Sequence, residues 1–304
     1  MSPENHLTTT QNSNFIPEIV ANQMLGALGA YLNLGRTVSK DSELTTAQVG
    51  DVINVSKRGA LSANTKSQGG VVTVQQPSLT NVPVTLDTHK EVTVGEEDFT
   101  RSLQVGSTLP GYAEDAVIAL GEEIETALSN LWPDISATFN NDATSDPVKD
   151  LIDGRTQMVK NKVPLMARKY AYLAPEYVGL LLKQNAFVDP KVIPNNQPLT
   201  EGAVGRVAGF DVFEGQLVAS SGSPRTFRNM LYTRNALVLA TRPLPKPDAN
   251  LGVQSSSVID ANGIALRLTR SYNSSQLATQ ITADILFGAD ALDIRQGGVI
   301  DYRP

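Results

Sequence analysis

Residues 264–288 read IALRLTRSYNSSQLATQITADILFG, and apolar and polar residues alternate on both sides of a short polar turn. This period of two predicts two strands, and Asn273-Ser274-Ser275 predicts the turn of an antiparallel hairpin with one buried face. An isolated hairpin is only marginally stable in water, so we expect it to pack against other elements. The expected buried positions are Ile264, Leu266, Leu268 and Tyr272 on the first strand and Leu277, Thr279, Ile281, Ala283, Ile285 and Phe287 on the second.

Composition excludes several classes of protein. The 304 residues suffice for about two domains, and the net charge of −6 argues against a general attraction to nucleic acid or anionic membranes. The absence of cysteine excludes disulfides and thiolate metal sites. No apolar run approaches the ~20 residues of a membrane helix, and the first residues lack a signal-peptide pattern. We therefore expect synthesis in a cytoplasm and no membrane partner.

The first third of the chain predicts a helix followed by an extended arm. Helical spacing over 17–34 predicts an amphipathic helix that ends at Gly35. VGDVINVS (49–56) and GGVVTVQQ (69–76) predict the two strands of a long arm over 49–77. We expect a tip with little apolar surface and with the basic residues Lys57, Arg58 and Lys66. Such an arm needs a neighbour for stability.

The longest predicted helix runs from Pro110 to Trp132, with an apolar stripe that includes Val117, Leu120, Ile124 and Leu128. Three glutamates, Glu122, Glu123 and Glu125, lie off this stripe, and we expect them to face solvent or a partner.

The middle of the chain predicts a mixed arrangement. Asp146 is the expected cap of a helix that begins at Pro147, and Pro175 is expected in the first turn of another. Strands are predicted over 205–215 and 228–242. The element order predicts an α+β fold whose two ends return to the same body.

No pattern indicates catalysis or a bound cofactor. The two histidines, His6 and His89, have no neighbours at metal-ligand spacing, and we expect surface or packing roles for both. The stretch 140–146 lacks the glycine and terminal glutamate of a calcium loop, and Glu96-Glu97-Asp98 is expected to form a solvated turn. Sequence-specific nucleic-acid binding is not expected, because the basic residues are scattered without interleaved aromatics: Lys57, Arg58, Lys66, Arg225, Arg228 and Arg234.

Four segments resemble, in this order, the major coat proteins of tailed bacteriophages. They are NFIPEIVANQML (14–25), VPVTLDTHKEVTV (82–94), AGFDVFEG (208–215) and GIALRLTRSYNSSQLATQITADILFGADALDIRQGGV (263–299). The likeness is to coat proteins similar to that of phage P22, which share the HK97-type capsid fold. One departure is that residues 205–242 are too few for the extra β-rich insertion that such proteins can carry.

The resemblance implies a set of subdomains. They are an N-terminal arm (1–35), a connector (36–48), an extended E-loop hairpin (49–81), a peripheral domain (82–145 and 246–304) with a spine helix at about 110–132, and an axial domain (146–245) with mixed α/β structure.

The implied function is that of a structural protein, without enzymatic activity or cofactor. It would self-assemble into pentamers and hexamers of an icosahedral or elongated shell around phage double-stranded DNA, which it would contact non-specifically. Scaffolding, portal and decoration proteins are expected partners, with assembly in the host cytoplasm and a final place in the virion. We expect Lys57, Arg58 and Lys66 of one subunit to reach Glu122, Glu123 and Glu125 of the next. The alternatives are an encapsulin-like compartment shell, and a non-assembling enzyme or binding module.

Overall fold

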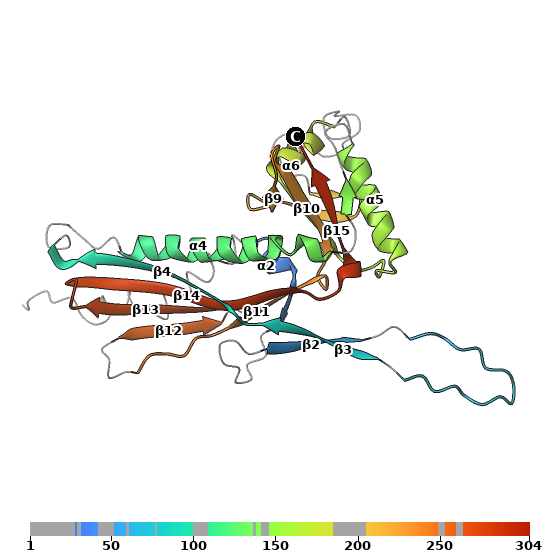
Figure 1. The fold of residues 1–304 in the computed structure, drawn as a ribbon, viewed down its shortest axis with the longest axis horizontal. Coiled ribbons are helices and arrows are strands. Elements are labelled where there is room, and N and C mark those ends of the chain that lie inside the picture. The colour runs from blue at the N-terminus through green and yellow to red at the C-terminus, as the bar shows by residue number, and fades with distance from the viewer. Residues whose placement is uncertain are drawn as a thin grey trace, which may run out of the picture.

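The computed structural model shows an elongated α+β protein in which a long, flat body carries a compact head at one end (Figure 1). A two-stranded hairpin projects from the junction, away from the body. The structure describes residue 28 and residues 32–41, 52–58, 61–76, 78–99, 109–135, 138–140, 146–184, 205–248, 253–259 and 264–304.

The body is a six-stranded sheet centred on its longest strand, β14 (Ala278–Ala291). β13 (Ala265–Asn273) pairs with it in antiparallel register, and Thr269 lies opposite Thr282. The predicted hairpin over 264–288 is therefore confirmed. The other strands are β1 (Ser39–Asp41), β4 (Thr88–Glu97), β11 (Leu237–Arg242) and β12 (Gln254–Ile259).

One long helix, α4 (Leu109–Ser129), packs on β4 and β14 along one face of this sheet (Figure 1). The predicted helix is confirmed, although it ends three residues earlier, before a 3-10 turn, η2 (Trp132–Asp134). The apolar stripe of the helix is fully buried, as expected: Val117, Leu120, Ile124 and Leu128.

The expected inner face of the hairpin is buried except near the turn, but the other face is not solvated throughout as expected, because Asp284 and Leu286 are also buried. Ile264, Leu266 and Leu268 are buried, as are Ile281, Ala283, Ile285 and Phe287. Tyr272 and Leu277, which we expected inside, are 53% and 60% exposed. The turn end of β13 and β14 extends past the start of α4 (Figure 1), and the Tyr272 hydroxyl there donates to the exposed Asp98 carboxylate at 2.6 Å.

The head is a seven-stranded sheet with two helices, α5 (Pro147–Lys160) and α6 (Pro175–Leu182). Both predicted helix starts are confirmed, because the Asp146 carboxylate accepts the Val148 N–H at 3.0 Å and Pro175 lies in the first turn of α6. Along the sheet, the strands are β5 (Thr138–Asn140), β15 (Gly297–Tyr302), β10 (Thr226–Thr233), β6 (Lys169–Leu173), β8 (Phe210–Glu214) and β7 (Arg206–Val207), and β9 (Ser220–Ser221) pairs with β10.

Three strands lie on the other side of the junction from where we expected them, and one of them is β5, which pairs with β15 in the head although we placed residues 82–145 with the body. The last strand, β15, pairs with β10 in the head, although we placed residues 246–304 with the body. β11 pairs with β14 in the body, although we placed it with the head. The chain crosses between the sheets after β10 and again before η4 (Ile294–Gln296), and the two crossings are joined where the Leu292 N–H donates to the Ala236 carbonyl. Sequence alternation predicts strands but not which sheet they join.

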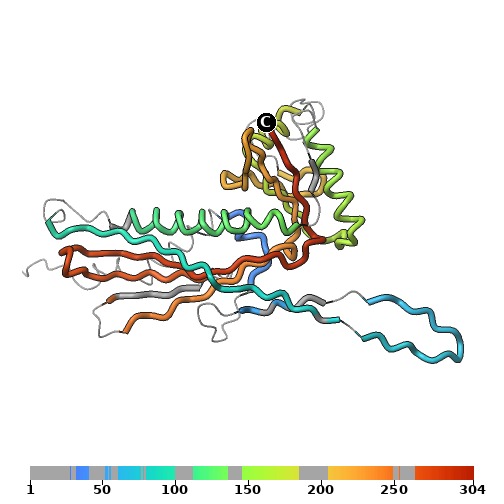
Figure 2. The backbone as a smooth tube through the Cα atoms, in the orientation of Figure 1, coloured from blue at the N-terminus to red at the C-terminus, as the bar shows by residue number. Residues whose placement is uncertain are grey.

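The projecting hairpin is formed by β2 (Val52–Arg58) and β3 (Leu79–Thr85) (Figure 2). Its second strand is not the segment 69–76 that we predicted, because β2 pairs ten residues further along, with Leu79–Thr85. Only Leu86 and Asp87 separate β3 from β4, so the hairpin continues directly into the body sheet. A small apolar cluster fixes its base: Ile53, Val84, Leu86, Val238 and Ala240.

The predicted N-terminal helix over 17–34 lies almost wholly outside the described residues. Gly35, which we expected to end it, instead lies inside the short helix α2 (Leu34–Thr37). The segment then enters β1, which pairs in parallel with β11.

Candidate subunit-contact surfaces

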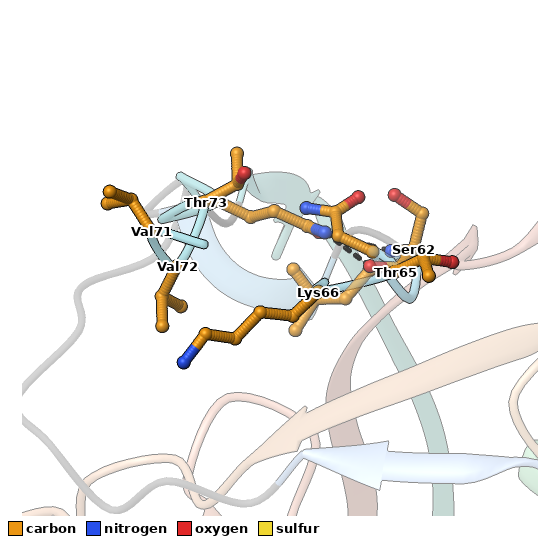
Figure 3. A pocket seen from close by; sticks show the side chains of 9 residues that line it. Ser62, Thr65, Lys66, Val71, Val72 and Thr73 are labelled. Carbon is orange, nitrogen blue, oxygen red and sulfur yellow. Dashed lines mark hydrogen bonds between the residues drawn. The ribbon is translucent and has the colours of Figure 1, made fainter. Parts of the chain in front are cut away.

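The loop at the end of the hairpin, residues 61–76, is more apolar than we predicted. Val71 and Val74 are 93% and 91% exposed, and Leu61 and Val72 are also mostly exposed. Figure 3 shows Val71, Val72 and Lys66 around an open pocket of about 450 Å³ between the two legs of the loop. Large exposed apolar side chains on an extended loop are typical of an interaction surface.

Few internal contacts hold this loop together. The Gln75 side chain bridges its two legs, accepting the Ser62 N–H at 3.1 Å and donating to the Ser62 carbonyl. Lys66 is exposed, as predicted. Lys57 and Arg58 lie in β2, and their side chains are outside the described residues.

The glutamates of α4 separate into two groups. Glu122 and Glu123 are exposed, as expected. The Glu123 carboxylate lies 2.8 Å from the Lys90 ammonium of β4, so this residue already has a partner in its own chain. An exposed pair of this kind contributes about 0–1 kcal/mol.

Glu125 was predicted to face solvent or a partner, and that prediction was wrong. Its side chain is buried and accepts two backbone N–H groups, from Leu34 at 3.1 Å and from Gly35 at 2.9 Å. Burial raises the pKa of Glu125 above its ordinary value, although these backbone hydrogen bonds oppose the shift. The carboxylate anchors α2 to α4, a contact between residues about 90 positions apart that helical periodicity cannot indicate.

The same short segment is tied to both sheets. The Thr37 hydroxyl lies 2.6 Å from the Tyr232 hydroxyl of β10, and the Ser39 N–H donates to the Arg234 carbonyl. On α4, Gly121 provides the close approach that this packing needs, because an added Cβ would lie 2.8 Å from the Leu28 side chain. Residues 32–41 are therefore an anchored base for the chain that precedes them.

The structure also describes His89 and Glu96, two other residues for which the sequence predicted a surface or packing role or a solvated turn. His89 lies 3.1 Å from the buried Asp284 carboxylate, which also pairs with Arg267. Glu96 lies within β4 and is buried, so the expected solvated turn at 96–98 was wrong at this residue. Among the described residues, no group of three metal-binding side chains gathers at one place, and no described helix has the length and hydrophobicity to cross a membrane.

The structure is similar to solved structures of phage and GTA capsid proteins. A chain of Mycobacterium phage Che8 superposes with a TM-score of 0.60 at 15% identity, over 83% of this chain and 84% of that chain. The capsid of Ralstonia phage GP4 gives a TM-score of 0.63 at 11% identity, over 88% and 87% of the two chains. The capsid of a native GTA particle gives 0.58 at 12% identity, over 90% and 92%.

The chain has a phage capsid fold. The HK97-type likeness expected from the four sequence segments is confirmed at the level of the fold. No protein-family model matches the sequence, and no curated protein matches it. Structural similarity at 11–15% identity therefore supports the fold that the four sequence segments predicted.

Proposed function

We propose that this chain is the major capsid protein of a tailed bacteriophage, a structural protein that assembles with copies of itself into a closed shell. The observation that carries the proposal is the hairpin β2–β3, which extends exposed aliphatic side chains away from the body. In this proposal the hairpin is the E-loop, α4 is the spine helix and the head is the axial domain.

Burial of the hairpin on a neighbouring copy supplies the free energy of association. Complete burial of one valine side chain stabilises by about 1.5–3 kcal/mol, and Val71, Val72 and Val74 are all exposed in a single copy. Since the hairpin of one copy meets a different surface of the next, the contact is heterologous and generates rings when the rotation closes. Pentamers and hexamers are the rings that an icosahedral or elongated shell requires.

Ionic contacts between copies are expected to fix how neighbouring copies align more than to add to their affinity. Lys57, Arg58 and Lys66 of one copy are proposed to approach Glu122 and Glu123 of the next. Glu125 is withdrawn from this contact, because it is buried against Leu34 and Gly35. Glu123 must exchange or share its Lys90 partner, which leaves Glu122 as the glutamate most open to a neighbour.

The remaining parts of the proposal follow from a shell that encloses phage double-stranded DNA. Its partners are other copies of the chain, scaffolding, portal and decoration proteins, and DNA held without sequence specificity. Its place is the virion after assembly in the host cytoplasm, and the proposal includes no enzymatic activity and no cofactor. An encapsulin-like compartment is the alternative, and no feature of the described residues favours it.

Electron microscopy of the purified protein, alone and with the scaffolding protein of the same phage, tests the proposal. Closed shells of uniform size are expected. Small soluble oligomers under both conditions would contradict it, and shells that copurify with an enzyme cargo instead of nucleic acid would favour the compartment.

A further inference from the structure

A basic pocket lies at the base of the head, where β6 and β10 meet η4. It has a volume of about 380 Å³. Its wall comes from three segments that are far apart in sequence, and these bring Arg168 and Arg234 to the same pocket. The pocket is lined by Pro164, Ala167, Arg168, Tyr170, Thr233, Arg234, Asn235 and Gln296.

Two guanidinium groups line this pocket without a carboxylate among its described lining residues. Arg234 is exposed and forms no ion pair with any described residue. Arg168 is 78% exposed, and its only described carboxylate neighbour, Asp211, lies 3.7 Å away and is shared with Arg206. Both arginines therefore retain donors for an external anion.

A buried lysine shapes the pocket from beneath. The Lys169 ammonium is buried and donates to the carbonyls of Leu165 and Ala167, which holds the turn that forms one wall. Burial lowers the pKa of Lys169, and the nearby charges of Arg155 and Arg206 lower it further. This positive surrounding is unusual in a chain of net charge −6.

The polar groups on the opposite wall are fixed in place. The Thr233 hydroxyl donates to the Gln296 side chain at 2.7 Å, and Gln296 in turn donates to Asp293 at 3.0 Å. The Asp293 carboxylate is itself engaged by Arg295 at 3.1 Å, so its charge is compensated outside the pocket lining. Tyr170 adds an aromatic wall, packed against Tyr232 and Phe213.

We propose that this pocket binds phosphate oxyanions through Arg168 and Arg234, with the Asn235 amide as a further donor. Arginine is suited to phosphate because its planar fork donates two parallel hydrogen bonds. In the particle these phosphates would belong to the sugar–phosphate backbone of the enclosed nucleic acid, an assignment that rests on the proposed function. Binding would be independent of base sequence, because such contacts position a duplex without reading it.

The test compares the double variant Arg168→Gln/Arg234→Gln with Arg225→Gln in the unassembled protein. Arg225 is a matched control, because it is exposed on the head, outside the pocket, and lies over the Phe227 ring at 4.9 Å. The probe is a fluorescent 20-base-pair DNA duplex, with binding followed by anisotropy from low to moderate salt.

The double variant is expected to bind the duplex at least tenfold more weakly than wild type at low salt. Loss of two phosphate contacts also lowers the slope of log K against log salt by about 2. Arg225→Gln is expected to bind like wild type, and inorganic phosphate should compete with DNA for wild type only.

Equal binding by the double variant and the control would overturn the proposal. Stronger competition by poly-glutamate than by DNA of equal charge would also overturn it, and would assign the pocket to an acidic protein partner; the exposed Leu165 and Met166 at its edge would then be part of that contact. Particle formation is scored separately by electron microscopy, so a failure of this site is distinguishable from a failure of the proposed function.

Discussion

The carboxylate of Glu125 on α4 lies 2.9 Å from the backbone nitrogen of Gly35 and accepts its hydrogen bond inside the protein. A second carboxylate oxygen accepts the Leu34 N–H. This one side chain therefore joins the start of the described chain to the longest helix.

Replacement Glu125→Ala is expected to lower the free energy of unfolding of the unassembled subunit by about 2–4 kcal/mol. It leaves two buried N–H groups without an acceptor, and each unsatisfied group costs about 1–3 kcal/mol. Urea unfolding followed by circular dichroism measures the change. Glu122→Ala is the matched control on the same helix, and as an exposed substitution it should change the free energy by less than about 0.5 kcal/mol.

The stability contribution of Glu125 should depend on pH in a defined direction. Its pKa is raised in the folded state above the ordinary value of 4.5, so the folded protein binds the proton more readily than the unfolded chain. That contribution is full below the unfolded pKa and is lost as the pH rises through the folded pKa.

As the pH falls from 7.5 to 4.5, the free energy of unfolding of wild type should therefore rise relative to that of Glu125→Gln. Urea midpoints across this range measure it, and subtraction of the variant removes the titration of the other carboxylates. A difference that stays constant, or shifts toward the variant on acidification, would show that the pKa is not raised.

The root of the hairpin depends on a close backbone contact at Gly288 of β14. An added Cβ there would lie 2.1 Å from the Thr85 carbonyl oxygen, and a backbone atom cannot move aside cheaply. Gly288→Ala is expected to destabilise the subunit by about 1–3 kcal/mol or more. The control is Gly179→Ala in α6, where nothing lies within 4 Å of the added Cβ, and where higher helix propensity should stabilise by about 0.5–1 kcal/mol.

The proposed ionic contact between copies predicts a charge-swap pattern. Lys66→Glu and Glu122→Lys should each slow particle assembly, by a modest factor because exposed pairs are worth about 0–1 kcal/mol. The double variant should recover part of the rate, as followed by light scattering at low salt. If both single variants assemble at the wild-type rate, these two residues do not meet.

Local patterns in the sequence were enough to predict much of the fold. The hairpin β13–β14, the helix α4 and the cap at Asp146 were all predicted, because alternation, helical periodicity and capping act over a few residues. Pairing between distant segments was not predictable in the same way. The partner of β2, the placement of β15 in the head and the burial of Glu125 each depend on contacts across long stretches of chain.

The candidate contact surface was only partly predictable for the same reason. Charge at Lys66 and Glu122 follows directly from residue type and exposure. The valines at 71–74 were assigned to a paired strand because they alternate, but β2 pairs elsewhere and leaves them exposed. These valines are exposed because β2 pairs with Leu79–Thr85, and the pairing of distant strands cannot be predicted from local sequence patterns.

We propose that the hairpin loop is stabilised by a neighbouring copy and not by its own chain. The most direct measurement compares wild type with the triple variant Val71→Ser/Val72→Ser/Val74→Ser for subunit stability and for particle formation, by urea unfolding and by sedimentation with electron microscopy. We predict an unchanged free energy of unfolding, within about 0.5 kcal/mol, together with a loss of closed particles. Normal particles from the triple variant, or a subunit destabilised by several kcal/mol, would contradict the account.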